Sequence, residues 1–335
     1  MRIGLFSVVD HYPTELDRTV QRFYDELLDQ ATAADELGLA SFWVAEHHFH
    51  EYGVIPRPAV WLAAAARVTR RIRLGSAVVV LPFDNPLRVA EDYAMADLLS
   101  DGRLELGIGS GYLAHEFAGF GIHTDDRRAR FQEALDIILA AWTGEPVTYA
   151  GKFYRCDRVK LNVRPKQQPT PPLAMAILHA ERAREVAVQG FSMMMIPYAT
   201  TEHIDELAEA VSAYREAFRP VPHIGGGGRV YCALHAHCGE TRGAARAATA
   251  EPLDRYVRTR LYARQRSYEE LDSRQLMAVG DPDDLCHVLR AYATAGFTDC
   301  LLIANFGGFR HAEVLRSLER ISRYVVRAVG TADEN

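Results

Sequence analysis

Residues 72–109, IRLGSAVVVLPFDNPLRVAEDYAMADLLSDGRLELGIG, contain a strand, a helix and a second strand in turn. Residues 72–81 and 104–108 are short runs of mainly aliphatic side chains, which are typical of buried strands. Residues 86–99 lie between them, and Asn85-Pro86 supplies a capping side chain followed by proline at the first helical position. This order predicts two parallel strands joined by a right-handed crossover.

The same alternation extends along the rest of the chain. Strands are expected at residues 2–9, 39–44, 72–81, 104–108, 173–177, 193–196, 229–236 and 299–305. Helices are expected at residues 19–37, 57–68, 86–99, 127–142, 180–189, 203–218, 242–262, 283–295 and 312–327. Gly38, Gly190 and Gly296 each precede a strand, where glycine readily adopts the left-handed helix cap. Eight strand-helix units favour a single (β/α)8 TIM barrel over residues 1–335, rather than an open doubly wound sheet.

Two segments exceed a minimal barrel and are predicted to be insertions on the same domain. Residues 147–172, after strand four, contain a hairpin turn expected at residues 149–152 and several prolines. Residues 264–280, after strand seven, are polar and are interpreted as a mobile lid. Function in such a barrel is expected at the carboxyl ends of the strands.

Composition excludes several classes of protein. The 335 residues carry a formal net charge of −6, which gives no general attraction to nucleic acid or to an anionic membrane. No segment approaches the roughly 20 apolar residues that span a bilayer. Five cysteines without paired spacing indicate reduced thiols, and the first residues resemble no targeting signal, so a cytoplasmic location is expected.

Histidines gather at the ends of two predicted strands. Glu46-His47-His48-Phe49-His50 follows strand two, and His235-Ala236-His237-Cys238 ends strand seven. These residue types can bind a metal, so a metallohydrolase is one hypothesis. However, neighbouring residues at a strand end point in opposite directions, which disfavours a shared ion at His47 and His48, and no metal ligand is assigned. Ordinary packing is the preferred interpretation of the second cluster.

A glycine-rich turn, Gly107-Ile108-Gly109-Ser110-Gly111-Tyr112, follows strand four. Its spacing is GxGxG, not the dinucleotide-binding GxGxxG. Such a turn lets the backbone approach a flat or phosphorylated ligand.

Together, these segments resemble the bacterial luciferase family of flavin-dependent monooxygenases. The resemblance rests on their order and spacing: Glu46-His47-His48-Phe49, residues 74–82, residues 86–92, residues 99–104 and the turn at residues 107–112. It implies a barrel that takes reduced flavin mononucleotide (FMN) from a separate flavin reductase. It also implies that O2 adds to the flavin to give a C4a-hydroperoxide, which oxidises a small organic substrate.

The resemblance also implies site residues. His47 matches the family's active-site histidine, whose imidazole suits proton transfer near neutral pH. Ala77-Val78 matches a position where the family often has a non-proline cis peptide beneath the flavin ring. The remaining residues expected to bind cofactor are Glu46, Gly109, Ser110, Tyr112, Leu178, His179 and Arg182.

Two departures from the family pattern concern the flavin phosphate. Ser110 stands where the family often has an arginine, and residues 178–182 replace a segment usually rich in serine and threonine. Backbone N–H groups near residue 180, with His179 or Arg182, would still attract an anion, so loosely held FMN is expected.

The substrate and the partners are predicted less directly. Aromatic residues near strand ends favour an apolar substrate: Tyr12, Phe49, Tyr52, Phe83, Tyr112 and Phe117. The alanine-rich helices at residues 58–66 and 89–98 favour a homodimer. A deazaflavin-dependent oxidoreductase and a flavin-binding homologue without turnover stay open as alternatives.

Overall fold

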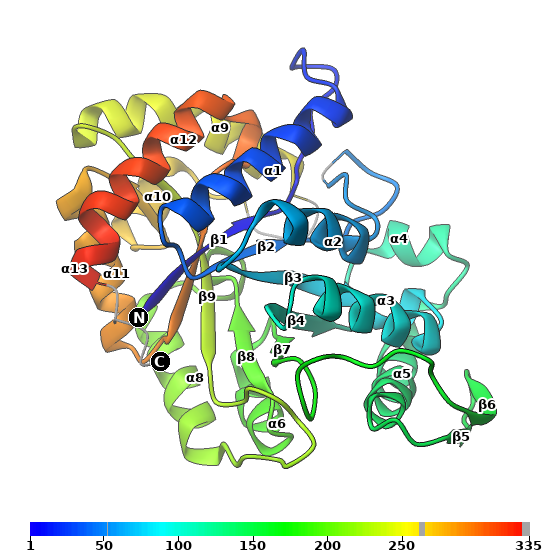
Figure 1. Ribbon diagram of the computed structural model, residues 1–335. Coiled ribbons are helices and arrows are strands. Elements are labelled where there is room, and N and C mark those ends of the chain that lie inside the picture. The colour runs from blue at the N-terminus through cyan, green and yellow to red at the C-terminus, as the bar shows by residue number, and fades with distance from the viewer. Residues whose placement is uncertain (52, 261–264, 330–335) are drawn as a thin grey trace.

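Eight parallel strands close into a barrel surrounded by helices, as the sequence predicted (Figure 1). The computed structural model describes residues 1–51, 53–260 and 265–329. The barrel strands are β1 (Arg2–Ser7), β2 (Ser41–Val44), β3 (Arg73–Val80), β4 (Leu104–Gly109), β7 (Leu173–Ala176), β8 (Ser192–Met195), β9 (Val230–Cys238) and β11 (Asp299–Ile303). They pair in the order β11-β1-β2-β3-β4-β7-β8-β9, and β9 closes the ring onto β11. All eight expected strands are confirmed, with ends that differ by at most two residues.

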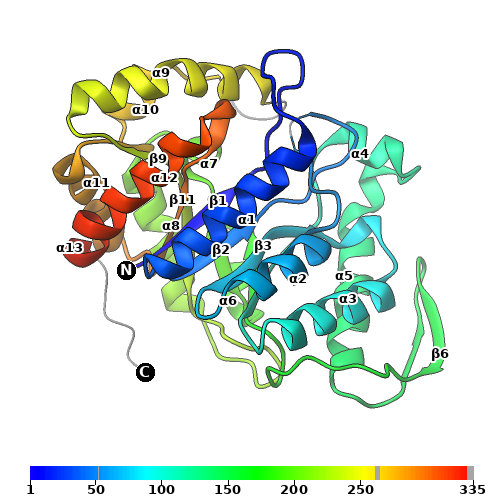
Figure 2. The same ribbon diagram turned by 45° about the horizontal axis from the view of Figure 1, so that its top comes forward.

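The helices lie around the outside of the strands (Figure 2). They are α1 (Val20–Glu36), α2 (Pro58–Val68), α3 (Pro86–Leu99), α4 (Ala114–Gly119), α5 (Arg127–Trp142), α6 (Ala183–Val188), α7 (Pro197–Thr200), α8 (Ile204–Ala217), α9 (Arg242–Thr259), α10 (Tyr268–Ser273), α11 (Pro282–Thr294), α12 (His311–Arg320) and α13 (Arg327–Val329). No helix in the described ranges is long and apolar enough to span a membrane.

Local signals explain several helix boundaries. The Asn85 side chain accepts a hydrogen bond from the backbone of Leu87 at the start of α3, as its position before proline predicted. Gly38, Gly190 and Gly296 have φ angles of 78°, 80° and 97°, which confirms the expected left-handed caps.

Some predicted helices differ from the structure. The helix expected at residues 180–189 is a 3-10 turn, Ala180–Arg182, followed by the short α6. The helix expected at residues 242–262 ends at Thr259, and residues 261–262 lie outside the described part of the chain. The last helix continues from α12 into α13 through a π-helical segment, Ile321–Val326.

Both insertions are present after the expected strands. The first contains an antiparallel hairpin of β5 (Val147–Ala150) and β6 (Arg155–Val159), which projects from the side of the barrel (Figure 2). Its turn lies at residues 151–154, two residues later than predicted, because Ala150 pairs with Arg155.

The end of the second insertion, residues 277–280, is part of the barrel sheet and not a mobile lid. The insertion contains α10 and a strand, β10 (Met277–Gly280), which pairs in parallel with the far half of β9 and is buried. The apolar side chains of β10 pack into the core, so this part of the lid interpretation is wrong. Residue 264 lies outside the described residues.

The amino ends of the strands are closed by a buried ionic cluster. Glu105, on β4, accepts hydrogen bonds from Arg229 at 2.9 Å and from the Tyr231 hydroxyl at 3.1 Å, and it also pairs with Arg2 and Arg73. Trp43 packs edge-on against Tyr231 at 5.4 Å between ring centroids. These side chains fill the amino end of the barrel.

Candidate active site

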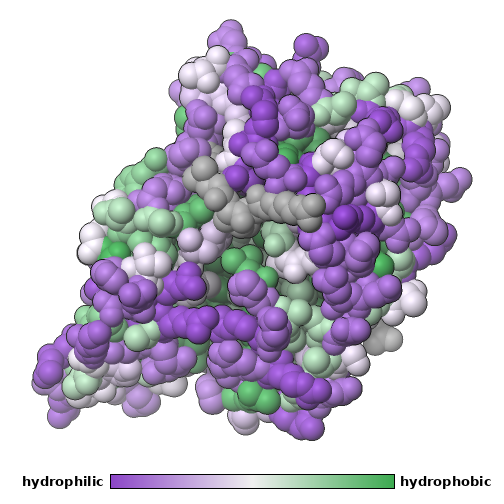
Figure 3. Space-filling model, turned by 180° about the vertical axis from the view of Figure 1, so that it is seen from behind, coloured by the Kyte–Doolittle hydropathy of each residue, from purple (hydrophilic) through white to green (hydrophobic). Residues whose placement is uncertain are grey.

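A pocket of about 1280 Å³, including its mouth, lies at the carboxyl ends of the barrel strands. Figure 3 shows a hollow on one face, with hydrophobic residues in its depth and mainly hydrophilic residues along its border. Every site residue expected from the sequence lines this one pocket: Glu46, His47, Ala77, Val78, Gly109, Ser110, Tyr112, Leu178, His179 and Arg182.

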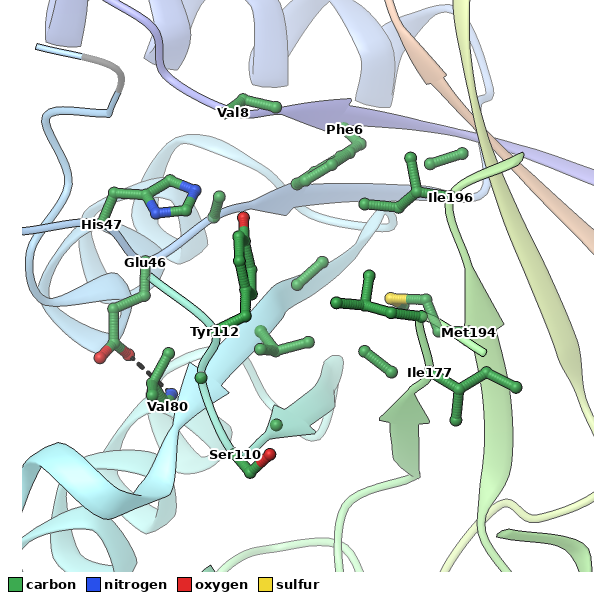
Figure 4. A pocket seen from close by; sticks show the side chains of 18 of the residues that line it. Phe6, Val8, Glu46, His47, Val80, Ser110, Tyr112, Ile177, Met194 and Ile196 are labelled. Atoms are coloured by element: carbon green, nitrogen blue, oxygen red, sulfur yellow. Dashed lines mark hydrogen bonds between the residues drawn. The ribbon is translucent and has the colours of Figure 1, made fainter. Parts of the chain in front are cut away.

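The apolar wall of the pocket differs from the one predicted. It is formed mainly by barrel residues, including Phe6, Val8, Ile177, Met194 and Ile196 (Figure 4). Sequence reasoning missed them because they belong to the strands or directly follow them, and their inward direction depends on closure of the barrel.

Most of the aromatic residues predicted to line the pocket lie elsewhere. Among those the structure describes, Tyr112 alone lines it. Phe83 packs on Phe117 at 4.8 Å, and Phe49 packs on Phe120 at 5.0 Å and is largely exposed. Tyr12 is buried and donates to Asp10. Tyr52 lies outside the described residues.

His47 is held by Glu116, which the sequence analysis did not identify. The His47 Nδ1 lies 3.2 Å from Glu116 Oε1, and the same oxygen accepts a hydrogen bond from the His48 backbone at 2.9 Å. A carboxylate only accepts, so Nδ1 carries the proton and Nε2 is the acceptor nitrogen of the ring. Glu116 lies on the short α4, after the glycine-rich turn. Its position shortly after the end of a barrel strand is the sequence feature that could have identified it as a site residue.

Burial sets the charge of His47. The side chain is almost fully buried, which lowers its pKa; the Glu116 carboxylate raises it, and the Arg260 charge lowers it again. Because the net direction is downward, the imidazole is neutral at neutral pH. The geometry therefore presents a neutral base in a buried pocket.

Glu46 and His48 form a second contact at the pocket edge. Their side chains lie 3.1 Å apart, between Oε1 and Nε2. Glu46 Oε2 accepts a hydrogen bond from the backbone of Val80 at 3.3 Å, which ties the end of β2 to the end of β3 (Figure 4). Burial raises the pKa of Glu46, and its bond to His48 opposes that rise. The side chains of His47 and His48 thus bond to different carboxylates, as expected for adjacent residues at a strand end.

The pocket floor includes the peptide between Ala77 and Val78, which is cis as the resemblance implied. The β3–β4 register shifts at this point, between Ser76 and Val79. A Cβ on Gly109 would lie 2.7 Å from Val78 Cγ2. Gly109 is therefore required for packing of β4 against this irregular strand, besides any approach to a ligand.

One end of the pocket is basic. Ser110 and Arg182 border both the main pocket and an adjoining recess, and Arg128 lies there with them. Arg182 donates to Glu185 through two hydrogen bonds, at 3.0 and 2.8 Å, so much of its charge is already compensated. Arg128 was missed by sequence reasoning; it is the second residue of α5, where the helix dipole also favours an anion. An arginine thus borders the recess beside Ser110, although it comes from α5.

The second histidine cluster is packed into the protein interior, as preferred in the sequence analysis. His235 contacts the rings of Tyr256 at 4.5 Å and Phe306 at 4.9 Å, and burial lowers its pKa to about 3. Among the described residues, no three His, Cys, Asp or Glu side chains form a group that would hold a metal ion.

The sequence matches the family of luciferase-like monooxygenases over residues 1–299. The 4-hydroxyprotoasukamycin monooxygenase of Streptomyces nodosus subsp. asukaensis is 31% identical over 321 residues, which cover 89% of this chain and 85% of that protein. Protein y4wF of Sinorhizobium fredii is 38% identical over 191 residues, which cover 57% of this chain and 56% of that protein. The match with y4wF thus spans little more than half of each protein.

Some relatives are named as dependent on the cofactor F420. The F420-dependent glucose-6-phosphate dehydrogenase of Amycolatopsis mediterranei is 36% identical over 153 residues, which cover 44% of this chain and 46% of that protein.

Two solved structures share the whole fold. The monooxygenase RslO1 from Streptomyces bottropensis has a TM-score of 0.89 at 28% identity, over 98% of this chain and 99% of that one. The oxygenating constituent of 3,6-diketocamphane monooxygenase from Pseudomonas putida, solved in complex with FMN, has a TM-score of 0.83 at 22% identity, over 99% of each chain.

Proposed function

Because the chain belongs to the luciferase-like monooxygenase family, we propose that it is the oxygenase of a two-component, FMN-dependent monooxygenase. It would receive reduced FMN from a separate flavin reductase and use O2 to oxidise a small, apolar organic substrate. One observation carries the proposal: a single pocket brings together an apolar floor at Ala77 and Val78, a basic end at Arg128 and the buried base His47. The apolar floor and the basic end suit a flat ring system with a phosphate-bearing chain, and the base suits proton transfer beside it.

The lining residues fit FMN by their chemistry. Ala77 and Val78 would support the ring system, and Tyr112 and Leu178 would contact it from other sides of the pocket. Ser110, Arg128, His179 and Arg182 would hold the phosphate, with Arg128 providing the arginine that position 110 lacks. When bound in reduced form, FMN supplies the electrons that activate O2.

His47 would hold and move a proton at the substrate or the flavin. Its Nε2 accepts because Nδ1–H is directed to Glu116. A lowered pKa keeps Nε2 unprotonated at neutral pH, which a general base needs. Burial of His47 and the apolar wall exclude water from the reacting groups.

The direct test supplies the purified protein with chemically reduced FMN and mixes it with air-saturated buffer in a stopped-flow spectrometer. We expect flavin oxidation to follow a course and an absorbance different from those of free reduced FMN. His47→Gln is the matched variant, expected to keep FMN affinity within about threefold and to lose product formation. Oxidation of reduced FMN at the rate of the free flavin would contradict the proposal.

A deazaflavin-dependent oxidoreductase is the second candidate, favoured by relatives named as F420-dependent. Parallel fluorescence titrations with FMN and F420 separate the two candidates. Binding of F420 at least tenfold tighter than FMN would favour the second. A flavin-binding homologue without turnover would bind FMN but show the same flavin oxidation with and without His47→Gln.

We also propose a homodimer through α2 and α3. These helices expose an unusual set of apolar side chains: Val60, Val68, Met95, Leu98 and Leu99. Val60 is 72% exposed and Met95 is 51% exposed, so a partner surface would remove considerable apolar area from water. Light scattering of the wild type and Val60→Asp should give dimer and monomer masses; a monomeric wild type would contradict this.

A further inference from the structure

The pocket contains a further arginine besides Arg127, Arg128 and Arg182. Arg260 directly follows α9, lines the pocket and is only 5% exposed. It is not among the residues that border the recess with Ser110 and Arg128. A buried guanidinium in an enzyme pocket is costly unless it serves a structural or a binding role.

Arg260 is oriented by an aromatic ring. Its Cζ lies 3.7 Å above the centroid of the Tyr256 ring, and Tyr256 also lines the pocket. Tyr256 is itself held in place, since its hydroxyl is 3.2 Å from that of Tyr198 and its ring packs edge-on against His235. Stacking on Tyr256 fixes the plane of the guanidinium, and a guanidinium donates its hydrogen bonds within that plane.

Arg260 shares the pocket with apolar side chains. Ile196, Ala233 and Ile303 line the pocket with it.

Arg260 also acts on His47 electrostatically. After burial and the opposing effect of Glu116, its charge is the next cause that shifts the His47 pKa, and it lowers that pKa. A group bound to Arg260 would therefore lie within electrostatic reach of the proposed base.

We propose that the substrate is a hydrophobic molecule with one anionic oxygen group, a carboxylate or an ionised phenol or enol, and that Arg260 binds this group. The inference rests on the proposed function, because it assigns the substrate class of the same pocket. The guanidinium edge would fix the anionic end, and the apolar wall would hold the body of the molecule beside His47 and the flavin floor. Planar paired donors match a carboxylate, which makes Arg260 a specificity residue.

The test compares acids with neutral molecules of the same shape. Protein saturated with FMN, which occupies the phosphate-binding end, is titrated with 1-naphthoate, benzoate and cyclohexanecarboxylate and with their three primary amides. Ligand-observed NMR competition gives the ratio of affinities. Arg260→Gln removes the charge, Arg260→Lys keeps it, and Arg258→Gln is the control at a 57% exposed arginine of the same segment.

We expect each acid to bind at least tenfold more tightly than its amide in the wild type and in Arg258→Gln. The preference should fall below threefold in Arg260→Gln and be partly retained in Arg260→Lys. Equal binding of acids and amides to the wild-type protein would overturn the inference without any variant, and so would a preference that survives Arg260→Gln.

Failure of the proposed function has a different signature. The FMN titration is performed first and reports on the cofactor alone. If FMN does not bind but the acid preference depends on Arg260 in the protein without flavin, the anion site stands and the flavin proposal fails.

Discussion

Replacing Glu116 with glutamine should release His47 from its single tautomer while preserving the shape of the pocket. Glu116 is 2% exposed and accepts from His47 Nδ1 at 3.2 Å. A hydrogen bond to a charged group contributes about 1.5–3 kcal/mol. Since about 1.4 kcal/mol corresponds to a factor of ten, the carboxylate favours the Nδ1–H tautomer by about 10- to 150-fold. A glutamine amide can donate as well as accept, so in Glu116→Gln the ratio should approach one.

The charge of His47 should change in a defined direction. The Glu116 carboxylate stabilises the imidazolium and raises the His47 pKa against the larger effect of burial. Removing that negative charge should therefore lower the His47 pKa further, and the ring should stay neutral to a lower pH. Product formation should fall by at least tenfold, because a large fraction of the rings would present N–H where the acceptor is needed.

The assay is 15N NMR of protein labelled in its histidine rings, with His47→Gln used to assign the His47 signals. Ring nitrogen shifts report the tautomer at neutral pH, and a pH titration reports the direction of the pKa change. Glu46→Gln is the matched control: it makes the same chemical change in the same pocket, but its carboxylate bonds to His48. An unchanged tautomer in Glu116→Gln, or a His47 pKa that rises, would refute the reasoning.

Three further predictions test the framework of the barrel and the basic recess. Glu105→Gln should lower the free energy of unfolding, measured in urea, by about 3–5 kcal/mol, because it removes the buried charge shared by several arginines. The control is Glu240→Gln at an exposed ion pair, which should lower it by less than about 1 kcal/mol. A loss below about 1 kcal/mol for Glu105→Gln would contradict this prediction. His235 has a pKa of about 3 in the folded protein and about 6.5 when unfolded, so the unfolded state takes up the proton first and stability is lost as the pH falls from 6.5 toward 3. In His235→Phe, the loss of unfolding free energy between pH 7 and pH 5 should be smaller by up to about 2 kcal/mol, and an identical loss in both proteins would argue against a neutral buried ring. Arg128→Gln should weaken FMN binding about 10- to 100-fold in a fluorescence titration, because a charge-assisted hydrogen bond is lost. The control, Arg184→Gln at an exposed arginine, should change FMN affinity less than twofold. Equal effects of the two variants would show that Arg128 does not bind the phosphate.

The barrel could be predicted from the sequence because its signals are local. Strand and helix periodicity follow from the backbone hydrogen bonds within each element, and Gly38, Gly190 and Gly296 mark the points where a helix must turn into a strand. Asn85 before Pro86 fixed the start of α3 for the same reason. The least predictable elements were short: α4, α7 and β10 have too few residues for a clear period.

The sequence also placed the expected site residues in one pocket. His47, Ala77 and Gly109 directly follow or lie near the ends of parallel strands, and parallel strands in a closed barrel bring those ends together. No knowledge of side-chain contacts was needed for this, because the topology alone puts them at one mouth.

Only the tertiary structure decided which distant side chains complete the pocket. Glu116 on α4, Arg128 on α5 and Arg260 after α9 lie on segments whose paths depend on how helices pack against the closed barrel. The same packing turned Phe49 and Phe83 away from the pocket. Local sequence determines the hydrogen bonding within each helix and strand. Which distant residues a side chain faces is determined by contacts between segments far apart in the chain, and these contacts exist only once the barrel has closed.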